Sequence, residues 1–414
     1  MSEWEFLQIK DLVSDGSLEK PLDGNHGGIH PKGADFVSSG IPFVMASDIN
    51  NSQIDLVGCK FISKQQALSL RKGFAKTGDV LLTHKATLGR TAIVPPLKTD
   101  FIMLTPQVTY YRVKDKNRIN NHYLKYYFDT PDFQQTLANH GDAGSTRAYI
   151  GITAQHDLPV ILPPINEQKA IASVLSSLDD KIDLLHRQNK TLESMAETLF
   201  RQWFDVDSND EWQEKNVLDI FTLVGGGTPK TSVAEYWTDE IPWISGGDIS
   251  AAHQGYLYST EKSISLAGLQ NSSAKLLPKN STVISARGTV GKYALLARDM
   301  AFSQSNYGIV SKIGSYPFFI YLLVGFIVDD LLTAAYGSVF DTITTRTFES
   351  VNLKFPSLNS IEKFNEEISP IFSKKETNTQ QIKTLENLRD TLLPKLMSGE
   401  VRVQYAEEAI ASVA

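Results

Sequence analysis

Two short turns, far apart along the chain, combine the residue types that bind phosphate groups. Each holds a basic side chain, a threonine, a glycine and a second basic side chain within six positions. Lysine and arginine neutralise phosphates, threonine hydroxyls donate to them, and arginine can also read guanine through two parallel hydrogen bonds. We therefore expect both turns to contact a nucleic acid. The candidate side chains are Lys85, Thr87, Arg90, Arg287, Thr289 and Lys292.

Four further candidates lie in glycine-containing segments. Arg147 follows a glycine–serine–threonine run, and Thr344 and Arg346 lie downstream of a second glycine–serine pair. Lys230 ends a glycine-rich loop that begins at Gly225 and could leave backbone N–H groups free for a phosphate. For every one of these positions a solvated turn without a ligand remains the alternative, and for the glycine-rich loop it is the preferred interpretation.

The motifs of catalysis and of metal binding are missing. The loop after Gly225 departs from the spacing of a phosphate-binding P-loop, and Pro229 removes an N–H that such a loop needs. We interpret His84 as a turn residue rather than a base. His26 and His30 have no carboxylate at ligand spacing, so we interpret them as exposed loop residues, although they could also enter a groove. We predict no catalytic residue and no metal site.

The elements that position these candidates occur twice in the chain. Ile41–Val44 followed by Asp48-Ile49 recurs as Ile241–Ile244 followed by Asp248-Ile249. The string Lys190–Glu193 recurs unchanged 193 positions later. Each repeat opens with short β-like runs broken by Gly, Pro and Asn, with helix-like patches between them, which is typical of an α+β domain.

Each repeat then closes with a long amphipathic helix. In the first, apolar residues alternate at spacings of four and three, which predicts a coiled-coil seam with a single polar position to fix its register. The second seam is more polar in its middle, and we expect Pro370 to kink or restart its helix. The first seam comprises Ile171, Leu175, Leu178, Ile182, Leu185, Asn189, Leu192, Ala196, Leu199 and Trp203. The second comprises Phe364, Ile368, Ile371, Lys375, Asn378, Ile382, Leu385, Arg389, Leu392 and Leu396.

Because both seams belong to one chain, we predict that they pair with each other, antiparallel, in a pseudo-two-fold arrangement. A coiled coil that joins two copies of the chain is the alternative. The predicted segments are a first recognition domain at 1–164, a helix at 165–204, a second domain at 205–358, a helix at 359–400 and a tail at 401–414.

This order of segments resembles the specificity subunit of type I restriction-modification systems over nearly the whole chain. The strings that carry the resemblance are Leu162–Lys169, which runs into the first heptad helix, and the two repeated entries at Gly40–Ile49 and Ile241–Ile249. Gly225–Pro229 and Glu235–Trp237 fit the same domain start. One departure is that Ser360-Ile361 stands where the first copy has Glu167-Gln168, the residues that we expect to face the coiled coil or a partner.

The resemblance implies a reader of double-stranded DNA that has no catalytic activity alone. Each domain would read one half of a split, asymmetric site, and the helices would set the spacing. Modification subunits would supply S-adenosylmethionine and adenine methylation, and restriction subunits would supply ATP- and magnesium-dependent translocation and cleavage. No cofactor is expected on this chain.

Composition excludes several classes of protein. A net charge of −7 argues against a protein that coats DNA without selectivity, so any DNA contact must use local basic clusters. The start of the chain has no secretory signal, and the apolar run Phe318–Val328 is shorter than the roughly 20 residues of a membrane span. The single cysteine, Cys59, excludes an internal disulfide, and we expect a cytoplasmic protein.

Two rival functions remain open at this stage. One is a scaffold of two ligand-binding domains on a dimerising stalk, which would ignore DNA. The other is an enzyme whose methyltransferase motifs have changed beyond recognition, which would transfer methyl groups unaided.

Overall fold

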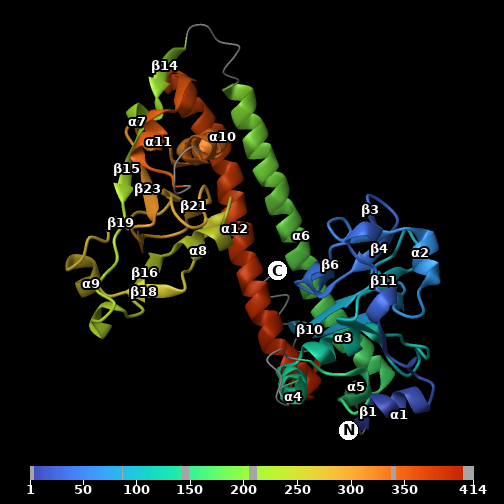
Figure 1. Ribbon diagram of the computed structural model, residues 1–414. Helices are drawn as coiled ribbons and strands as arrows, with labels where there is room; N and C mark the ends of the chain where they lie inside the picture. Colours follow the sequence, from blue (N-terminus) through green and yellow to red (C-terminus); the bar gives the residue numbers. More distant parts are fainter. Residues whose placement is uncertain (1–3, 86, 142–148, 205–211, 337–341, 404–414) are drawn as a thin grey trace. The chain divides into compact units, whose positions relative to one another are not determined.

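The computed structural model describes residues 4–85, 87–141, 149–204, 212–336 and 342–403. The chain divides into two compact units (Figure 1). Unit 1 contains residues 1–183 and 383–414, and unit 2 contains residues 184–382. Each unit therefore combines one sheet-rich domain with one half of each long helix. This division differs from the predicted one, which set the helices apart as segments of their own.

Unit 1 is built around two sheets with a shared apolar core. The core takes Leu81 and Ala92 from one sheet and Val44, Ile102 and Leu104 from the other. The first sheet has the order β10 (Thr87–Ile93), β9 (Val80–Lys85), β12 (Val108–Tyr111) and β2 (Leu22–Asp23). The second has the order β3 (Phe36–Val37), β7 (Lys60–Ile62), β4 (Ile41–Val44), β11 (Ile102–Leu104) and β8 (Phe74–Ala75).

Short elements complete unit 1. The helical patch expected at residues 123–137 is two helices, because Thr130 separates them: it precedes Pro131, and a residue before proline avoids the helical region. The short strands are the pair β5 (Ile49–Asn50) and β6 (Gln53–Ile54). The helices are α1 (Ile9–Ser14), α2 (Lys64–Ser69), α3 (Asn121–Asp129), α4 (Pro131–Gly141) and α5 (Ile152–Gln155).

Unit 2 repeats this plan. Ile244, Val283, Ala294, Leu296 and Phe302 form the core between its sheets. The first sheet has the order β15 (Phe221–Gly225), β23 (Asn306–Ser311), β20 (Thr282–Ser285), β21 (Tyr293–Leu296) and β17 (Tyr256–Leu257). The second has the order β18 (Lys262–Ile264), β16 (Ile241–Ile244), β22 (Met300–Phe302) and β19 (Leu276–Leu277). The short helices are α7 (Val217–Ile220), α8 (Gly246–Ala251), α9 (Leu266–Gln270) and α11 (Thr345–Glu349).

In each unit a two-stranded ribbon joins the two ends of the recognition domain. In unit 1, β1 (Glu5–Gln8) pairs antiparallel with β13 (Pro159–Leu162). In unit 2, β14 (Gln213–Asn216) pairs in the same way with β24 (Asn352–Phe355). Because the second strand of each ribbon leads directly into a long helix, the ribbon fixes each domain to the start of that helix.

The most apolar helix of the described residues, α10 (Pro317–Tyr336), belongs to the core of unit 2. It continues past the two aspartates that end the apolar run, and its length and mean hydropathy of 2.0 would suffice to cross a membrane. However, nine of its residues are buried in unit 2, among them Phe319, Val324 and Leu331. It packs with the core cluster that also holds Phe348 and Phe364, as the central helix of a folded domain does.

The long helices are α6 (Ile165–Trp203) and α12 (Leu358–Met397). Within each unit their halves run antiparallel. In unit 2, Asn378 lies beside Asn189 while Phe364 lies beside Phe200, so the partner's number falls as the α6 number rises. The expected fold class, α+β domains with an antiparallel pair of helices in one chain, is confirmed. The seam residues of each helix pack against the other long helix of the same chain, which argues against a coiled coil between two copies of the chain.

Most seam positions are buried side chains. On α6 the five seam residues from Ile171 to Leu185 are no more than 5% exposed, whereas the seam residues Asn189 and Leu192 are half-buried. On α12, Ile382 is 4%, Leu385 1% and Leu392 7% exposed. The two asparagines meet here: the amide of Asn378 donates to Asn189 Oδ1 at 3.0 Å, and the amide of Asn189 donates to Thr379 Oγ1 at 3.1 Å. Paired amides in an apolar seam penalise shifted registers.

The expected interruption at Pro370 is wrong. The helix α12 runs through it without a break. Pro370 is exposed, so the carbonyl that loses its helical donor remains open to water. Its neighbours Phe364, Ile368 and Phe372 are each at most 3% exposed, and their burial outweighs a cost of about 3 kcal/mol for proline in a helix.

Candidate nucleic-acid interface

In unit 2 the candidate residues gather at one end of the five-stranded sheet. There β15 and β20 end while β23 and β21 begin, with Gly225 opposite Tyr307 and Ser285 opposite Asn306. The connecting loops therefore meet at this end. We call residues 226–230, 286–292, 303–305 and 342–346 the unit 2 sheet end. It contains Lys230, Arg287, Thr289, Lys292, Thr344 and Arg346.

Backbone hydrogen bonds hold three of these segments together. Ala286 N donates to Ser305 O at 2.9 Å, and Ile343 N donates to Ala286 O at 3.1 Å. The residues that follow in sequence, Arg287 and Thr344, are therefore brought close to each other from segments far apart in the chain. Their side chains and that of Arg346 are exposed. The two predicted groups of unit 2 thus belong to one surface.

Unit 1 has the same two connections. His84 N donates to Gln107 O at 2.9 Å, and Ile150 N donates to His84 O at 3.0 Å. His84 therefore occupies the place of Ala286, and Lys85 that of Arg287. We call residues 24–30, 84–87, 105–107 and 149–150 the unit 1 sheet end, of which Ala86 is not described. Lys85 is exposed, with its Nζ 5.6 Å from the centre of the Tyr149 ring. Arg147 lies outside the described residues.

Arg90 has a structural role that its sequence context does not reveal. Its Nη1 donates to Ile49 O at 3.0 Å and to Asn50 Oδ1 at 2.6 Å. The guanidinium thereby joins β10 to the small β5–β6 pair. Any contact of Arg90 with a nucleic acid must use its remaining N–H groups, whereas Lys85 is the freer cation of this turn. Thr87, the third candidate of the turn, is half-buried.

The equivalent turn of unit 2 is shaped by glycine and hydroxyl groups. Gly288 and Gly291 have φ of 78° and 82°, a left-handed conformation that favours glycine. Thr289 Oγ1 donates to Gly246 O at 3.2 Å, which leaves this hydroxyl oxygen as an acceptor. Arg287 and Thr289 are exposed and Lys292 is half-buried. Ionic contact at this turn would therefore come mainly from Arg287.

The glycine-rich loop of unit 2 is packed rather than open. A Cβ on Gly226 would lie 2.2 Å from Ser303 O, and the N–H of Gly227 donates to Phe302 O at 2.9 Å. The loop therefore needs its glycines to lie against the neighbouring strand, and the N–H of Gly227 is not free for a phosphate. Its last residue, Lys230, is exposed and remains available to a phosphate.

A buried charged cluster in unit 1 was not predicted. Asp23 is 2% exposed, and its carboxylate pairs with Lys72 Nζ and lies 2.7 Å from His26 Nε2. The expectation that His26 has no nearby carboxylate is therefore wrong. The available signal was the spacing of three residues between Asp23 and His26, which is within reach across a tight loop. Lys72, far away in sequence, could not have been found in this way.

His84 is a buried strand residue and not the turn residue that we expected. It is fully buried, its Nδ1 lies 2.9 Å from Ile150 O, and its Nε2 lies 3.9 Å from Asp23 Oδ2 without a hydrogen-bond partner. Burial lowers the pKa of His84 below its ordinary value of 6.5, although the Ile150 carbonyl and Asp23 oppose the shift. The expected turn begins only after Lys85, at the end of β9.

The residues at the start of α6 serve unit 1 itself. Gln168 is 1% exposed, accepts from Asn120 N at 3.0 Å and donates to Pro163 O at 2.8 Å. Its amide is therefore used to fix the helix start to the recognition domain. Glu167 Oε2 accepts from Trp4 Nε1 at 3.2 Å. In the second repeat Ile361, fully buried, replaces the Gln168 contact with an apolar one.

Metal binding has no support in the described part of the chain, where His, Cys, Asp and Glu do not gather in groups of three or more that could hold an ion. The single thiol, Cys59, is buried, and burial raises its pKa to about 11.

Comparison with known proteins agrees with this architecture. Residues 1–194 and 209–388 match the family described as the type I restriction modification DNA specificity domain. The chain is 25% identical to the type I restriction enzyme MjaIX specificity subunit of Methanocaldococcus jannaschii, with 97% of this chain and 94% of the relative covered. It is 23% identical to the HindI specificity subunit of Haemophilus influenzae, with 97% and 100% covered.

A solved structure shares the fold. The S subunit of a type I restriction-modification system from M. genitalium superposes with a TM-score of 0.61 at 12% identity, over 95% of this chain and 96% of that one. Two copies of one family domain, each including most of a long helix, account for the repeat seen in the sequence. The chain belongs to the family of type I restriction-modification DNA specificity domains.

Proposed function

We propose that the two units read the two halves of a split DNA target through their sheet ends. As a DNA-specificity subunit of a type I system, the chain selects the DNA on which its partner subunits act and is not itself the catalyst. The observation that supports the sheet ends is their repetition: the same backbone connections place Lys85 in unit 1 and Arg287 in unit 2.

The side chains around these two cations differ, which supports an asymmetric target. The unit 1 sheet end contains His84 and His26, and His26 Nε2 lies 2.7 Å from the buried carboxylate of Asp23. In unit 2 the place of His84 is taken by Ala286, and Thr228 donates to Gln304. Direct readout depends on the donors and acceptors that a surface presents. Two surfaces with different donors and acceptors would prefer different bases.

The remaining parts of the proposal concern partners and location. S-adenosylmethionine, ATP and magnesium would bind the modification and restriction subunits, and this chain would carry none of them. Because such a complex acts on chromosomal DNA, we place it in the cytoplasm. The helices α6 and α12 would set the number of base pairs between the two half-sites.

The test is the salt dependence of DNA binding. The full chain in complex with its modification subunits is titrated with a duplex that carries its methylation site, for the wild type, Lys85→Ala and Arg287→Ala. Each variant should reduce the slope of log affinity against log salt by about 1, because each removes roughly one phosphate contact. The matched control is Lys64→Ala, an exposed lysine at the start of α2, outside the sheet ends, whose slope should stay unchanged. Unchanged slopes for both sheet-end variants would remove these surfaces from the DNA contacts.

A further inference from the structure

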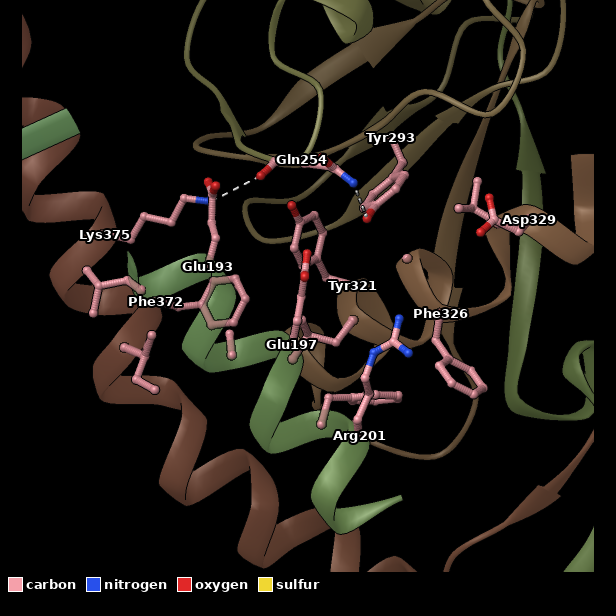
Figure 2. A pocket seen from close by; sticks show the side chains of 17 residues that line it. Glu193, Glu197, Arg201, Gln254, Tyr293, Tyr321, Phe326, Asp329, Phe372 and Lys375 are labelled. Carbon is pink, nitrogen blue, oxygen red and sulfur yellow. Dashed lines mark hydrogen bonds and ion pairs between the residues drawn. The ribbon is translucent and has the colours of Figure 1, made fainter. Parts of the chain in front are cut away.

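Unit 2 contains a cavity of about 220 Å³ between the second half of α6, α10 and the first half of α12 (Figure 2). Five aromatic rings line it: Phe200, Tyr293, Tyr321, Phe326 and Phe372. Aromatic walls attract cations, because the face of each ring is electronegative. The cavity is separate from the unit 2 sheet end, since none of its lining residues belongs to the loops that form it.

The repeat shows which group is missing from this cavity. The identical strings Lys190–Glu193 and Lys383–Glu386 align Ala196 with Arg389. In unit 1 the guanidinium of Arg389 is half-buried, with its Nη1 2.9 Å from Asp179 Oδ1. In unit 2 the aligned residue Ala196 ends at a methyl group, is 2% exposed and lines the cavity. One repeat therefore has an arginine side chain at the position where the other has a space.

The acceptor of that arginine has also changed. The same alignment places Phe372 at the position of Asp179. Phe372 is 3% exposed and stacks on Phe318 with ring centres 4.4 Å apart. Where unit 1 binds a cation by charge, unit 2 offers an aromatic surface beside the empty position.

Carboxylates supply negative charge to the cavity. Figure 2 shows that Glu197 projects from its helix toward Tyr321, whereas Glu193 on the same helix projects toward Lys375. The charged side chains that line the cavity are Glu193, Glu197, Asp329, Arg201 and Lys375, which give a formal net charge of −1. Glu193 is paired with Lys375, so Glu197 and Asp329 are the carboxylates left for a ligand, while Arg201 opposes a cation.

A strained residue fixes the polar side of the cavity. Gln254 has φ of 60°, a left-handed conformation that is strained for a non-glycine residue. Its backbone carbonyl accepts from Lys375 Nζ at 3.1 Å, and its side-chain amide lies 3.5 Å from the Tyr293 hydroxyl. The Tyr293 hydroxyl in turn occupies the space that a Cβ on Gly325 would need, 2.4 Å away. The lining is therefore held in place before any ligand binds.

We propose that this cavity binds a guanidinium or ammonium group on an aliphatic chain, in the place that Arg389 fills in the other repeat. The cation would lie against the Tyr321 and Phe326 rings and face the carboxylates of Glu197 and Asp329. Its source is either a basic side chain of a partner subunit or a free polyamine. This inference does not depend on the sheet ends as the DNA-reading surface.

Isothermal titration calorimetry of the full chain with agmatine and with spermidine tests the site. Glu197→Gln should weaken binding roughly three- to ten-fold, the effect expected of one partly exposed charge and its cation–π neighbours. Arg201→Gln should strengthen binding by a similar factor, because it removes a competing positive charge. Ala196→Arg should abolish binding, since its own guanidinium would occupy the space.

The matched control lies in unit 1. Arg389→Ala should create a second binding site, and Arg389→Ala combined with Ala196→Arg should leave only that one. If bound modification subunit blocks agmatine, the natural occupant is a partner side chain; if agmatine still binds the complex, the occupant is a free polyamine. Absence of heat in both the wild type and Arg201→Gln would overturn the proposal. So would binding that persists undiminished in both Glu197→Gln and Ala196→Arg, because the cation would then bind elsewhere.

Discussion

The two units attach their recognition domains to the same pair of helices with different chemistry. In unit 1 the contact is ionic: Lys125 Nζ lies 3.0 Å from Asp129 and 3.5 Å from Asp179, which also pairs with Arg389. In unit 2 it is aromatic, with Phe372 of α12 stacked on Phe318 of α10 at 4.4 Å between ring centres.

The ionic contact of unit 1 and the aromatic contact of unit 2 also contribute differently to stability. Burial of aromatic rings stabilises strongly and without dependence on salt, whereas a buried ion pair gains little net stability but penalises any arrangement that leaves one charge unpaired. The stability of unit 1 should therefore depend on each charge keeping its partner. The stability of unit 2 should depend on aromatic side chains filling the space between the domain and the helices.

The largest effect is expected where both units share a helix. Leu185→Pro places a proline inside α6 at a residue that is 3% exposed, and should cost at least about 3 kcal/mol and abolish assembly with the modification subunits. Co-purification and methylation of a target duplex provide the readout. Leu184→Ala, at an exposed neighbour, should leave both intact. Normal methylation by Leu185→Pro would refute the role of the helices.

The ionic and aromatic attachments are compared directly by Phe372→Ala and Asp179→Ala. Phe372→Ala should destabilise the protein by about 3–5 kcal/mol through loss of a buried ring. Asp179→Ala should cost about 2 kcal/mol, less than for a fully buried pair because its side chain is 23% exposed. In denaturant titrations, the Asp179→Ala deficit should shrink as salt rises and the Phe372→Ala deficit should not. Identical salt responses would contradict the comparison.

A smaller effect is expected at the asparagine pair in the middle of the helices. Asn378→Leu should cost about 1–2 kcal/mol, because the half-buried Asn189 loses a partner. The double variant Asn189→Leu with Asn378→Leu should recover that stability and should form some dimers or shifted registers. Urea unfolding and sedimentation measure the two effects. A double variant that stays strictly monomeric would show that register is fixed elsewhere.

The smallest effect concerns pH. Burial lowers the pKa of His84 below 6.5, so below that pH the unfolded chain binds the proton before the folded one. Stability should therefore fall as the pH falls through the window below 6.5, at no more than about 1.4 kcal/mol per pH unit. His84→Ala, which copies Ala286 of unit 2, should have a flatter profile than the wild type in urea titrations between pH 5 and 7.5. Parallel profiles would exclude His84 as the source.

The helices and the repeat could be predicted from the sequence because their signals are local. The heptad spacing from Ile171 to Leu185 depends only on neighbouring residues, and an identical string aligned the second seam. Pro370 shows the limit of such rules. Whether a proline breaks a helix depends on the face of the helix on which it lies, and Pro370 lies on the exposed face of α12.

The candidate site could be predicted only in part. The basic turns were found from composition, but their convergence depends on hydrogen bonds such as Ile343 to Ala286, which join residues that no local pattern connects. The same holds for the Asp23–Lys72 pair and for the contacts of Arg90. The cavity beside Ala196 exists because this residue has only a methyl group where the other repeat has an arginine side chain. This difference is recognised only when the two repeats are compared in three dimensions.

The central claim is that the two units select one split DNA sequence. The most direct test expresses the chain with its modification subunit in a host that lacks adenine methylation, followed by a genome-wide map of methylated adenines. The account predicts one asymmetric motif in two parts with a fixed gap, methylated on both strands, and no methylation when Leu185→Pro replaces the wild type. A contiguous palindromic motif, or methylation without sequence preference, would contradict it.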